Sequence, residues 1–429
     1  MRGVRTLVAG SIAALAALSS LPAAPAGAAP APALRKQTST LAPGVTYTRI
    51  TDSSVPLRTY VVTLDPTKAA SLDVEAAGST FGKYSPTSSI ASAEGALAAI
   101  NGDFTSDGVP VHAFAEEAAL KTAGSNVGAT FAISRDEAHR YLRSGAKAVI
   151  TGVNQANGRS FDVAGWNSEG PHRGEIAAFT AMGGSVRRPP SGACSARLLP
   201  SGGYRWGPSK SGVVRDYTVD VMRCQQDPVS TSGGVVLAAD RDGSAADQVR
   251  AMSPGGVVTL TWDVDEWAGV TDVVGGAPQL LANGRVVASD NCGTYFCLRN
   301  PRAGIGYTED GKILLVVVDG RSTSSIGVTP VGFAHVFKNL GATSALNLDG
   351  GGGATMWVKG KGVVNVPSDG SERVVSNAVL VLPGSDRDEP TGLARTRMRL
   401  ASRSEAAAAE AAALADPAST GGLLDLYGG

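Results

Sequence analysis

The sequence has little of several features that mark common classes of protein. Aromatic residues make up 5% of its 429 residues, histidines number four, and Lys plus Arg balance Asp plus Glu at 38 each. No segment gathers basic and aromatic side chains together, as a nucleic-acid-binding surface requires. We therefore expect no nucleic-acid partner.

Cysteine is scarce as well, with Cys194, Cys224, Cys292 and Cys297 as its four copies. There is no C-x-x-C pair, and so few histidines make a cysteine-bound metal unexpected. Three disulfide pairings are formally available, and sequence alone does not choose between them. The short spacing of Cys292 and Cys297 allows a small loop, which would leave Cys194 and Cys224 to close a longer one.

Long apolar runs are absent except near the N-terminus. Arg2 and Arg5 flank the start of the apolar stretch 7–21, and residues 26–29 are small enough for cleavage. This layout is typical of a secretory signal peptide over residues 1–29, with an uncleaved anchor as the alternative. The stretch is short for a membrane span of roughly 20 apolar residues. We expect a secreted, extracellular protein with no stable membrane insertion after cleavage, a compartment in which disulfides persist.

Charged residues are also few, at 18% of the chain against roughly 25% in average domains. Glycine is abundant, with 54 copies, and this mixture favours strands and turns over long surface helices. The expected fold is α+β, a large mixed β-sheet core with a few helices in a single catalytic domain over residues 41–383. Residues 30–40 read as a flexible lead-in and 384–429 as a low-complexity, mobile tail.

Apolar periodicity places the main elements along the chain. Residues 57–64 and 72–76 are predicted to be paired strands, and residues 313–318 a central strand buried on both faces. The other predicted strands are 213–222, 235–239, 257–262 and 374–382, and the predicted helices are 85–98, 245–252 and 330–340. Asn283-Gly284 and Asp310-Gly311 each lie between apolar runs, a pattern that indicates hairpins.

The most informative stretch runs from Ala345 to Trp357, with the sequence A-L-N-L-D-G-G-G-G-A-T-M-W. It predicts a strand that ends on Asp349, followed by four glycines at 350–353. Bare glycine backbone can approach a ligand closely, and its N–H groups can form an anion-binding nest. A tight glycine-rich turn between two strands is the simpler alternative.

Further polar residues cluster at the ends of predicted strands, where a rigid scaffold presents functional groups. Each one alone has an ordinary explanation, such as an Asp-Gly turn at Asp319, a surface ion pair at Arg299 or a loop position at His112. Several in one repeating pattern favour a functional site. They are Asn101, Asp103, His112, Arg299, Asn300, Asp319, Arg321, Asp349, Glu372, Arg373 and Asn377.

Six short motifs follow one another along the chain. They are A-I-N-G-D-F at 99–104, G-G-A-P-Q-L-L at 275–281, R-N-P-R-A-G-I-G at 299–306, V-D-G-R at 318–321, L-N-L-D-G-G-G at 346–352 with Thr355 and Met356, and E-R-V-V-S-N at 372–377. In this order they resemble the phosphodiester glycosidase family. The resemblance runs from about Tyr60 to Leu382 and is strongest after Gly275. This chain departs from the family pattern at Gly353 and Ala354, where a hydroxyl residue is usual, and at Thr105, where a second aromatic residue is frequent.

The resemblance implies a hydrolase that cleaves the bond between a sugar anomeric carbon and a phosphodiester. The candidate catalytic carboxylates are Asp349, Asp103 and Glu372, which would activate water or stabilise an oxocarbenium-like transition state. Forked arginine donors would hold the phosphate. The candidate substrate-binding residues are Asn101, His112, Arg299, Asn300, Asp319, Arg321, Gly350, Gly351, Gly352, Thr355, Arg373 and Asn377.

Cofactors and competing functions stay open at this point. Asp103, Asp319 and Asp349 offer the oxygen ligands that calcium or magnesium takes, although no motif with metal-ligand spacing supports a metal. The expected partner is a sugar-1-phosphodiester or a phosphate-containing glycopolymer. A non-catalytic cell-envelope protein that binds anionic glycopolymers is the main alternative, and cleavage of a simple phosphodiester at its P–O bond is another.

Overall fold

The computed structural model describes residues 34–68, 70–116, 119–124, 128–134, 140–144, 149–200, 213–263 and 270–384. The predicted signal peptide and nearly all of the predicted tail lie outside these ranges. Among the described residues, no helix has the length and apolar character needed to cross a bilayer.

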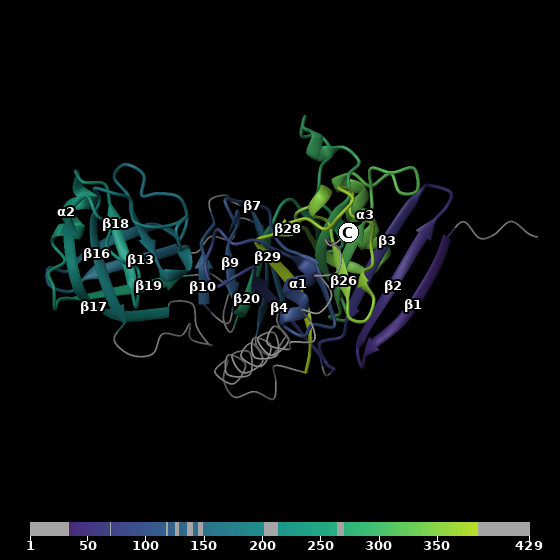
Figure 1. Ribbon diagram of the computed structural model, residues 1–429, viewed down its shortest axis with the longest axis horizontal. Helices are drawn as coiled ribbons and strands as arrows, with labels where there is room; N and C mark the ends of the chain where they lie inside the picture. The colour runs from purple at the N-terminus through teal and green to yellow at the C-terminus, as the bar shows by residue number, and fades with distance from the viewer. Residues whose placement is uncertain are drawn as a thin grey trace, which may run out of the picture.

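The largest element is an eight-stranded antiparallel sheet, visible on the right of Figure 1. Ile313–Val318 lies between two neighbours at its centre, and Leu315 and Val317 face one core while Leu314 and Val316 face another. The prediction of a strand buried on both faces is thus confirmed. In spatial order the strands are β1 (Leu34–Ala42), β2 (Val45–Asp52), β3 (Leu57–Leu64), β24 (Ile313–Val318), β23 (Arg302–Thr308), β25 (Ala342–Asn347), β21 (Gln279–Ala282) and β22 (Arg285–Val286).

A five-stranded sheet packs against the inner face of this larger sheet. Ile100 and Val379 from the smaller sheet share one hydrophobic core with Val62 and Leu315 from the larger one. The two sheets therefore form a sandwich, and loops from both reach the same edge. The strands of the smaller sheet, in spatial order, are β27 (Gly362–Val363), β26 (Met356–Val358), β6 (Ala98–Asn101), β29 (Asn377–Pro383) and β4 (Ala70–Ala76).

Two helices cover the outer faces of the sandwich. Helix α3 (Pro330–Asn339) buries Phe333 and Phe337 against the eight-stranded sheet, and Thr329 caps it by accepting a hydrogen bond from the N–H of Gly332. Helix α1 (Thr87–Ala93) buries Ile90 against the five-stranded sheet. The remaining short elements near the sandwich are β5 (Ser85–Pro86), β7 (Thr105–Ser106), β8 (Val109–Pro110), β28 (Val374–Val375), η2 (Tyr295–Cys297) and η3 (Gly351–Gly353).

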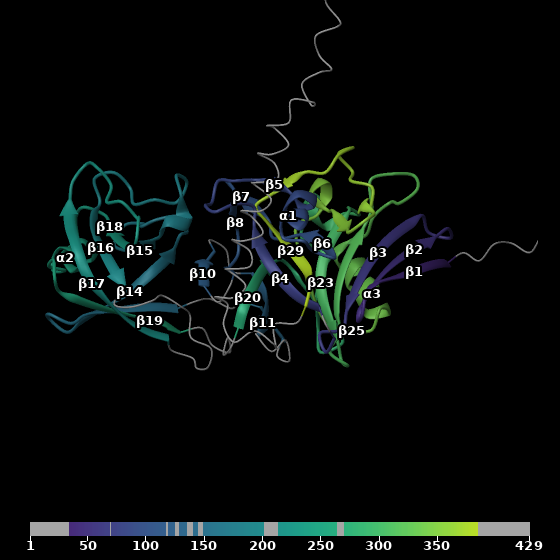
Figure 2. The ribbon, with the colours of Figure 1, turned by 60° about the horizontal axis from the view of Figure 1, so that its bottom comes forward.

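A closed seven-stranded barrel forms the other end of the molecule, at the left in both Figure 1 and Figure 2. Trp166, Tyr217 and Trp262 fill its interior, and Ala246 and Val249 of helix α2 (Ser244–Arg250) pack into the same hydrophobic core. In order around the barrel, the strands are β13 (Val149–Asn154), β14 (Arg159–Trp166), β15 (Ile176–Phe179), β18 (Val235–Ala239), β16 (Cys194–Pro200), β17 (Val213–Cys224) and β19 (Val257–Asp263).

A second five-stranded sheet lies between the barrel and the sandwich (Figure 2). Phe131 and Val274 from this sheet join the sandwich core, while Leu120 and Val273 join the barrel core. It therefore connects the two bodies through packed side chains. Its strands are β10 (Ala119–Thr122), β9 (Phe114–Glu116), β20 (Val270–Gly276), β11 (Ala129–Ser134) and β12 (Arg140–Ser144), and η1 (Ala181–Gly183) follows β15.

Many element predictions are confirmed, including helix α3, strand β18 and the hairpins at Asn283-Gly284 and Asp310-Gly311. The β-rich core with few helices is confirmed too. The eight-stranded sheet and the two five-stranded sheets, however, are antiparallel rather than mixed, and the one parallel pair among the described strands, β14 with β15, lies in the barrel. Strand β3 pairs with β2 and β24, not with β4, which pairs with β29.

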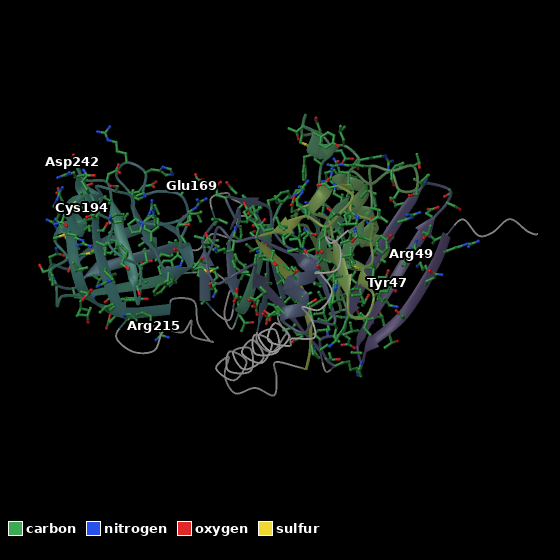
Figure 3. The ribbon with its side chains drawn as sticks, in the orientation of Figure 1. Tyr47, Arg49, Glu169, Cys194, Arg215 and Asp242 are labelled. Atoms are coloured by element: carbon green, nitrogen blue, oxygen red, sulfur yellow. A yellow bond between two sulfur atoms is a disulfide. The ribbon has the colours of Figure 1, made fainter. Side chains whose placement is uncertain are left out.

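The predicted lead-in over 30–40 is wrong for residues 34–40, because β1 already pairs with β2 from Leu34 onward. Of the three disulfide pairings that the sequence left open, the structure has Cys194 with Cys224 and Cys292 with Cys297. Cys194 and Cys224 face each other across β16 and β17, and Cys292 bonds to Cys297. Figure 3 shows Cys194 in the barrel, at the opposite end of the molecule from Tyr47 and Arg49 of β2.

Candidate active site

A pocket of about 220 Å³ opens where the strand ends of the sandwich meet. Some lining residues follow strand β25, others lie just before or at the start of β23, and one follows β24. Distant parts of the chain therefore converge at the pocket. Its lining combines one carboxylate, three guanidinium groups, aromatic rings and bare glycine backbone. The lining residues are Phe104, Tyr295, Phe296, Asn300, Arg302, Arg321, Asp349, Gly350, Gly351, Gly352 and Arg373.

Asp349 supplies the carboxylate of this pocket. Its backbone N–H donates to the carbonyl of Gly102 (3.1 Å), and its own carbonyl accepts from Nδ2 of Asn101 (2.7 Å), which ties the end of β25 to β6. Burial raises the pKa of Asp349 to about 6, although the N–H of Gly350 and the charge of Arg373 partly offset this effect. The group can therefore exchange a proton near neutral pH.

Three of the four glycines make room for charged side chains. A Cβ on Gly351 would lie 2.9 Å from Nη2 of Arg321, and one on Gly353 would lie 2.6 Å from Oδ2 of Asp349. A Cβ on Gly352 would collide with the side chains of Asp369 and Arg373. Successive glycines of the loop thus allow Arg321, Arg373 and Asp349, in that order, to pack against its backbone.

The glycine N–H groups are less available than the nest hypothesis expects. The N–H of Gly350 donates to Oδ1 of Asp349 (2.9 Å), that of Gly351 to the carbonyl of Pro301 (2.9 Å), and that of Gly353 to the carbonyl of Gly350 (3.1 Å). Three of the four donors therefore already have acceptors within the protein. The main contribution of these glycines is space.

Arg302 is a buried cation, with 1% of its surface exposed. Its Nε donates to the carbonyl of Val328 (3.2 Å), and its Nη2 donates to the carbonyls of Phe296 and Leu298. In the described part of the chain its hydrogen-bond partners are thus all backbone oxygens. Burial lowers the pKa of Arg302 to about 10, so the side chain stays charged at neutral pH. A buried guanidinium held this way is suited to bind an anion.

Arg321 and Arg373 share one carboxylate. Nε of Arg373 donates to Oδ2 of Asp369 (3.1 Å), while Nη1 of Arg321 lies 4.0 Å from Oδ1 of the same side chain. Nε of Arg321 also donates to Oδ1 of Asn300 (3.2 Å). Two half-exposed cations against one anion leave an excess of positive charge, to which Arg302 adds.

Aromatic rings form the remaining wall. The ring centroids of Phe104 and Phe296 lie 6.2 Å apart, and Cζ of Arg302 lies 4.5 Å from the ring of Phe296. Cζ of Arg321 lies 5.5 Å from the ring of Tyr295. Such rings offer flat apolar faces to a ligand next to the charged groups.

Comparison with known proteins bears on the part of the chain that supplies most of this pocket. Residues 210–382 match the phosphodiester glycosidase family. The resemblance inferred from the motifs is confirmed over this segment, which contains Asp349, Arg302, Arg321 and Arg373. Phe104 of the pocket, and Asp103 beside it, lie outside the matched segment.

One curated relative is the SPbeta prophage-derived uncharacterized protein YomE of Bacillus subtilis (strain 168), which is 39% identical over 92 residues. The match covers 21% of this chain, and the chain spans only 14% of that relative's length. The match therefore shows that one segment of the two proteins is similar, and it says nothing about the rest of the relative.

Two solved structures share the fold. A hypothetical protein from Synechocystis matches with a TM-score of 0.65 and 20% identity, covering 82% of this chain and 64% of its own. A candidate exported protein from Burkholderia pseudomallei K96243 matches with a TM-score of 0.57 and 24% identity, covering 76% of this chain and 74% of its own. At these identities the likeness concerns the fold alone.

The structure brings one group of the sequence-predicted residues into this pocket. The residues of this group are Asn300, Arg321, Asp349, Gly350, Gly351, Gly352 and Arg373. Sequence reasoning missed Arg302 and the three aromatic residues as site residues. Arg302 belongs to the motif at 299–306 and begins an apolar strand. A charged residue at the start of a buried strand was the sequence signal that could have identified it as a site residue.

A second group lies under the pocket wall, around Asp103. Both oxygens of Asp103 are used: Oδ1 accepts from the N–H of Phe104 (2.7 Å) and contacts Nδ1 of His112 (2.7 Å), and Oδ2 accepts from the N–H of His112 (2.7 Å). Oδ1 of Asn377 accepts from the N–H of Asp103 (2.9 Å). These buried residues shape the loop that carries Phe104 and are absent from the pocket lining.

Asn101 and Thr355 are buried beside Asp349. Nδ2 of Asn101 donates to the Asp349 carbonyl, and its Oδ1 accepts from the N–H of Thr355 (3.1 Å). The carboxamide of Asn101, which we expected to bind substrate, is therefore occupied by backbone groups. This arrangement suits a role in holding the loop of Asp349.

Three more predicted residues lie outside the pocket lining. Asp319 is buried, where it accepts from the hydroxyl of Tyr60 (2.9 Å) and the N–H of Val366 (2.9 Å), and burial raises the pKa of its carboxyl. Glu372 accepts from the N–H of Ser88 (2.7 Å) at the start of helix α1. Arg299 is exposed and donates to the carbonyl of Gly327 (3.1 Å). These contacts favour structural roles.

Metal ligands do not gather in the described ranges of the chain, where no group of three or more His, Cys, Asp or Glu side chains is placed to hold a metal ion. Both carboxylate oxygens of Asp103, and both of Asp319, accept hydrogen bonds from within the protein. A divalent cation at this site stays a prediction, and it would have to rely on Asp349 and the substrate.

Proposed function

We propose that this protein hydrolyses a sugar-1-phosphodiester, cleaving between the anomeric carbon and the phosphate oxygen. The observation that carries the proposal is the pocket composition: a half-buried Asp349 with a pKa of about 6 lies among three guanidinium groups and an aromatic wall. The family match over residues 210–382 supports the same reaction class.

In this proposal the phosphate binds to the guanidinium groups of Arg302 and Arg321, with Arg373 at the edge. Charge-assisted hydrogen bonds from forked donors hold phosphate oxygens firmly. The same groups stabilise the negative charge that grows on the phosphate as the C–O bond breaks. Since a phosphomonoester is a good leaving group, protonation of the leaving oxygen is less critical than for an ordinary glycoside.

Asp349 acts on the sugar side of the bond. Its ionised carboxylate either removes a proton from the attacking water or stabilises positive charge at the anomeric carbon. Water delivers its hydroxyl to that carbon, and the phosphomonoester departs with the electron pair of the broken bond. Asp103 and His112 contribute by fixing the loop that presents Phe104.

Export is part of the proposal. The two disulfides suit an oxidising compartment, and the N-terminal layout is that of a signal peptide. A structural neighbour from Burkholderia pseudomallei carries the description of a candidate exported protein. The substrate would then be a glycosyl phosphodiester met outside the cytoplasm, such as part of an envelope glycopolymer.

The test is the release of reducing sugar from N-acetylglucosamine 1-(methyl phosphate). Turnover that disappears in Asp349→Asn, with folding verified by circular dichroism, supports the proposal. Tight binding without any release favours instead a protein that binds anionic glycopolymers, a reading that the excess of guanidinium groups also fits.

A further inference from the structure

The small loop closed by Cys292 and Cys297 adjoins the pocket and is separate from the strands that form it. Its two cysteines are five residues apart in sequence, with Cα atoms 5.9 Å apart. Tyr295 and Phe296 lie inside this disulfide loop and line the pocket, although 61% of Tyr295 is exposed. The loop is thus closed by a disulfide, while Tyr295 within it is largely exposed.

Backbone carbonyls of the disulfide loop and of the residue after it hold one pocket guanidinium directly. Nη2 of Arg302 donates to the carbonyls of Phe296 and Leu298, and the ring of Phe296 stacks 4.5 Å from Cζ of the same arginine. Phe296 therefore contacts this buried cation through both its carbonyl and its ring.

The guanidinium of Arg321 is connected to the disulfide loop through the side chain of Asn300. Nδ2 of Asn300 donates to the carbonyl of Tyr295 (2.9 Å), and Oδ1 of Asn300 accepts from Nε of Arg321 (3.2 Å). The ring of Tyr295 lies 5.5 Å from Cζ of Arg321. Both cations of the proposed phosphate site thus depend on contacts that residues 295–298 provide.

The two disulfides differ in what they can do for stability. A bond that closes a short loop removes less conformational entropy from the unfolded chain than a bond that closes a longer loop. Cys194 and Cys224 are 30 residues apart and join two paired strands of the barrel. Cys292 and Cys297 close only five residues, so their main effect falls on the local geometry.

We propose that the Cys292–Cys297 disulfide is a positioning device for the anion site, and that it orients Arg302 and Arg321 rather than stabilising the fold. The proposal rests on the proposed function only in naming the anion as the substrate's phosphate. Cys292 and Cys297 are positioning residues, since they act through the two arginines.

The experiment compares two double variants, Cys292→Ala with Cys297→Ala and, as the matched control, Cys194→Ala with Cys224→Ala. Isothermal titration calorimetry measures the affinity for inorganic phosphate and for glucose 1-phosphate, and thermal unfolding measures stability. We expect the 292/297 variant to bind both anions about tenfold more weakly, with its melting temperature lowered less than that of the control. The control should melt earlier and keep the wild-type affinity.

Several outcomes would overturn the proposal. They are unchanged anion affinity in the 292/297 variant, failure of that variant to fold, or wild-type protein that binds neither anion. Phe296→Ala, which keeps the disulfide but removes the ring from Arg302, should also weaken anion binding. If the wild type binds the anions in the expected way yet hydrolyses nothing, the proposed function fails while the positioning role stands.

Discussion

At the scale of single residues, Asp349 carries the most specific expectation. Burial raises its pKa to about 6, above the ordinary value near 4 for an aspartate. The protonated form is thus favoured in the folded protein, and the stability it contributes is present below pH 4 and lost as the pH rises through about 6. At pH 8 the folded protein carries the cost of a desolvated charge.

Asp349→Asn should therefore separate stability from activity. We expect the variant to lose turnover by about 100-fold or more. Thermal unfolding should show it to be at least as stable as the wild type at pH 8, with this advantage gone at pH 4. A variant that is markedly less stable at pH 8 would contradict the assignment of a desolvated carboxylate. Wild-type kcat/KM should fall as the pH drops below about 6.

Arg302 offers a second residue-scale prediction. Arg302→Lys keeps the charge but loses the planar fork, so kcat/KM should fall about 10–100-fold, the value of one or two charge-assisted hydrogen bonds. Arg299→Lys is the matched control, because that exposed side chain contacts only the carbonyl of Gly327 among described residues and should behave like the wild type. Equal losses in both variants would argue against a phosphate site at Arg302.

Sequence patterns predicted part of the candidate site and missed another part for physical reasons. Asp349 and its glycines were accessible because a carboxylate after an apolar strand and a glycine run are local signals. Arg302 was not selected, since burial of an arginine depends on carbonyls of Phe296 and Leu298 that only the folded chain places around it. Glu372 was overrated because its partner Ser88 lies 284 residues away in sequence.

At the scale of elements, Glu372 tests whether a side chain from a distant loop caps the start of helix α1. Both of its carboxylate oxygens bind Ser88, one through the N–H and one through the hydroxyl, at the first turn of that helix. Glu372→Gln should lower the free energy of unfolding by about 1 kcal/mol, as loss of a helix cap does, and leave kcat unchanged. Chemical denaturation and a steady-state assay check the two halves. Loss of turnover without loss of stability would return Glu372 to the catalytic candidates.

Element positions were more predictable than element partners. Strands β18 and β24 begin and end where apolar runs begin and end, because burial follows directly from composition. The pairing of β4 with β29 joins segments about 300 residues apart, and no local pattern encodes such a contact. Strand β1 was missed because its residues are exposed and polar, and only the neighbouring β2 makes them extended.

At the scale of the whole molecule, the question of a metal can be tested. Asp103 and Asp319 come from different loops and use their oxygens within the protein, so they do not converge on Asp349 as ligands. We expect dialysis against EDTA to leave sugar release unchanged. Loss of activity on dialysis, with recovery when calcium or magnesium is added back, would restore the metal hypothesis.

The sandwich brings the proposed chemistry together because its two sheets share a core and end at one edge. The N–H of Asp349, just after β25 of one sheet, bonds to the carbonyl of Gly102, just after β6 of the other, so the carboxylate is fixed across the sandwich. The guanidinium groups come from the start of β23, the loop after β24 and the loop before β28. The barrel lies at the other end of the molecule from this edge.

The most direct measurement is hydrolysis of N-acetylglucosamine 1-(methyl phosphate) in water labelled with heavy oxygen, followed by mass spectrometry of both products. The account predicts that wild-type protein releases sugar with the label on its anomeric hydroxyl and unlabelled methyl phosphate, and that Asp349→Asn releases neither. Label in the phosphate, or no release by the wild type, would contradict it.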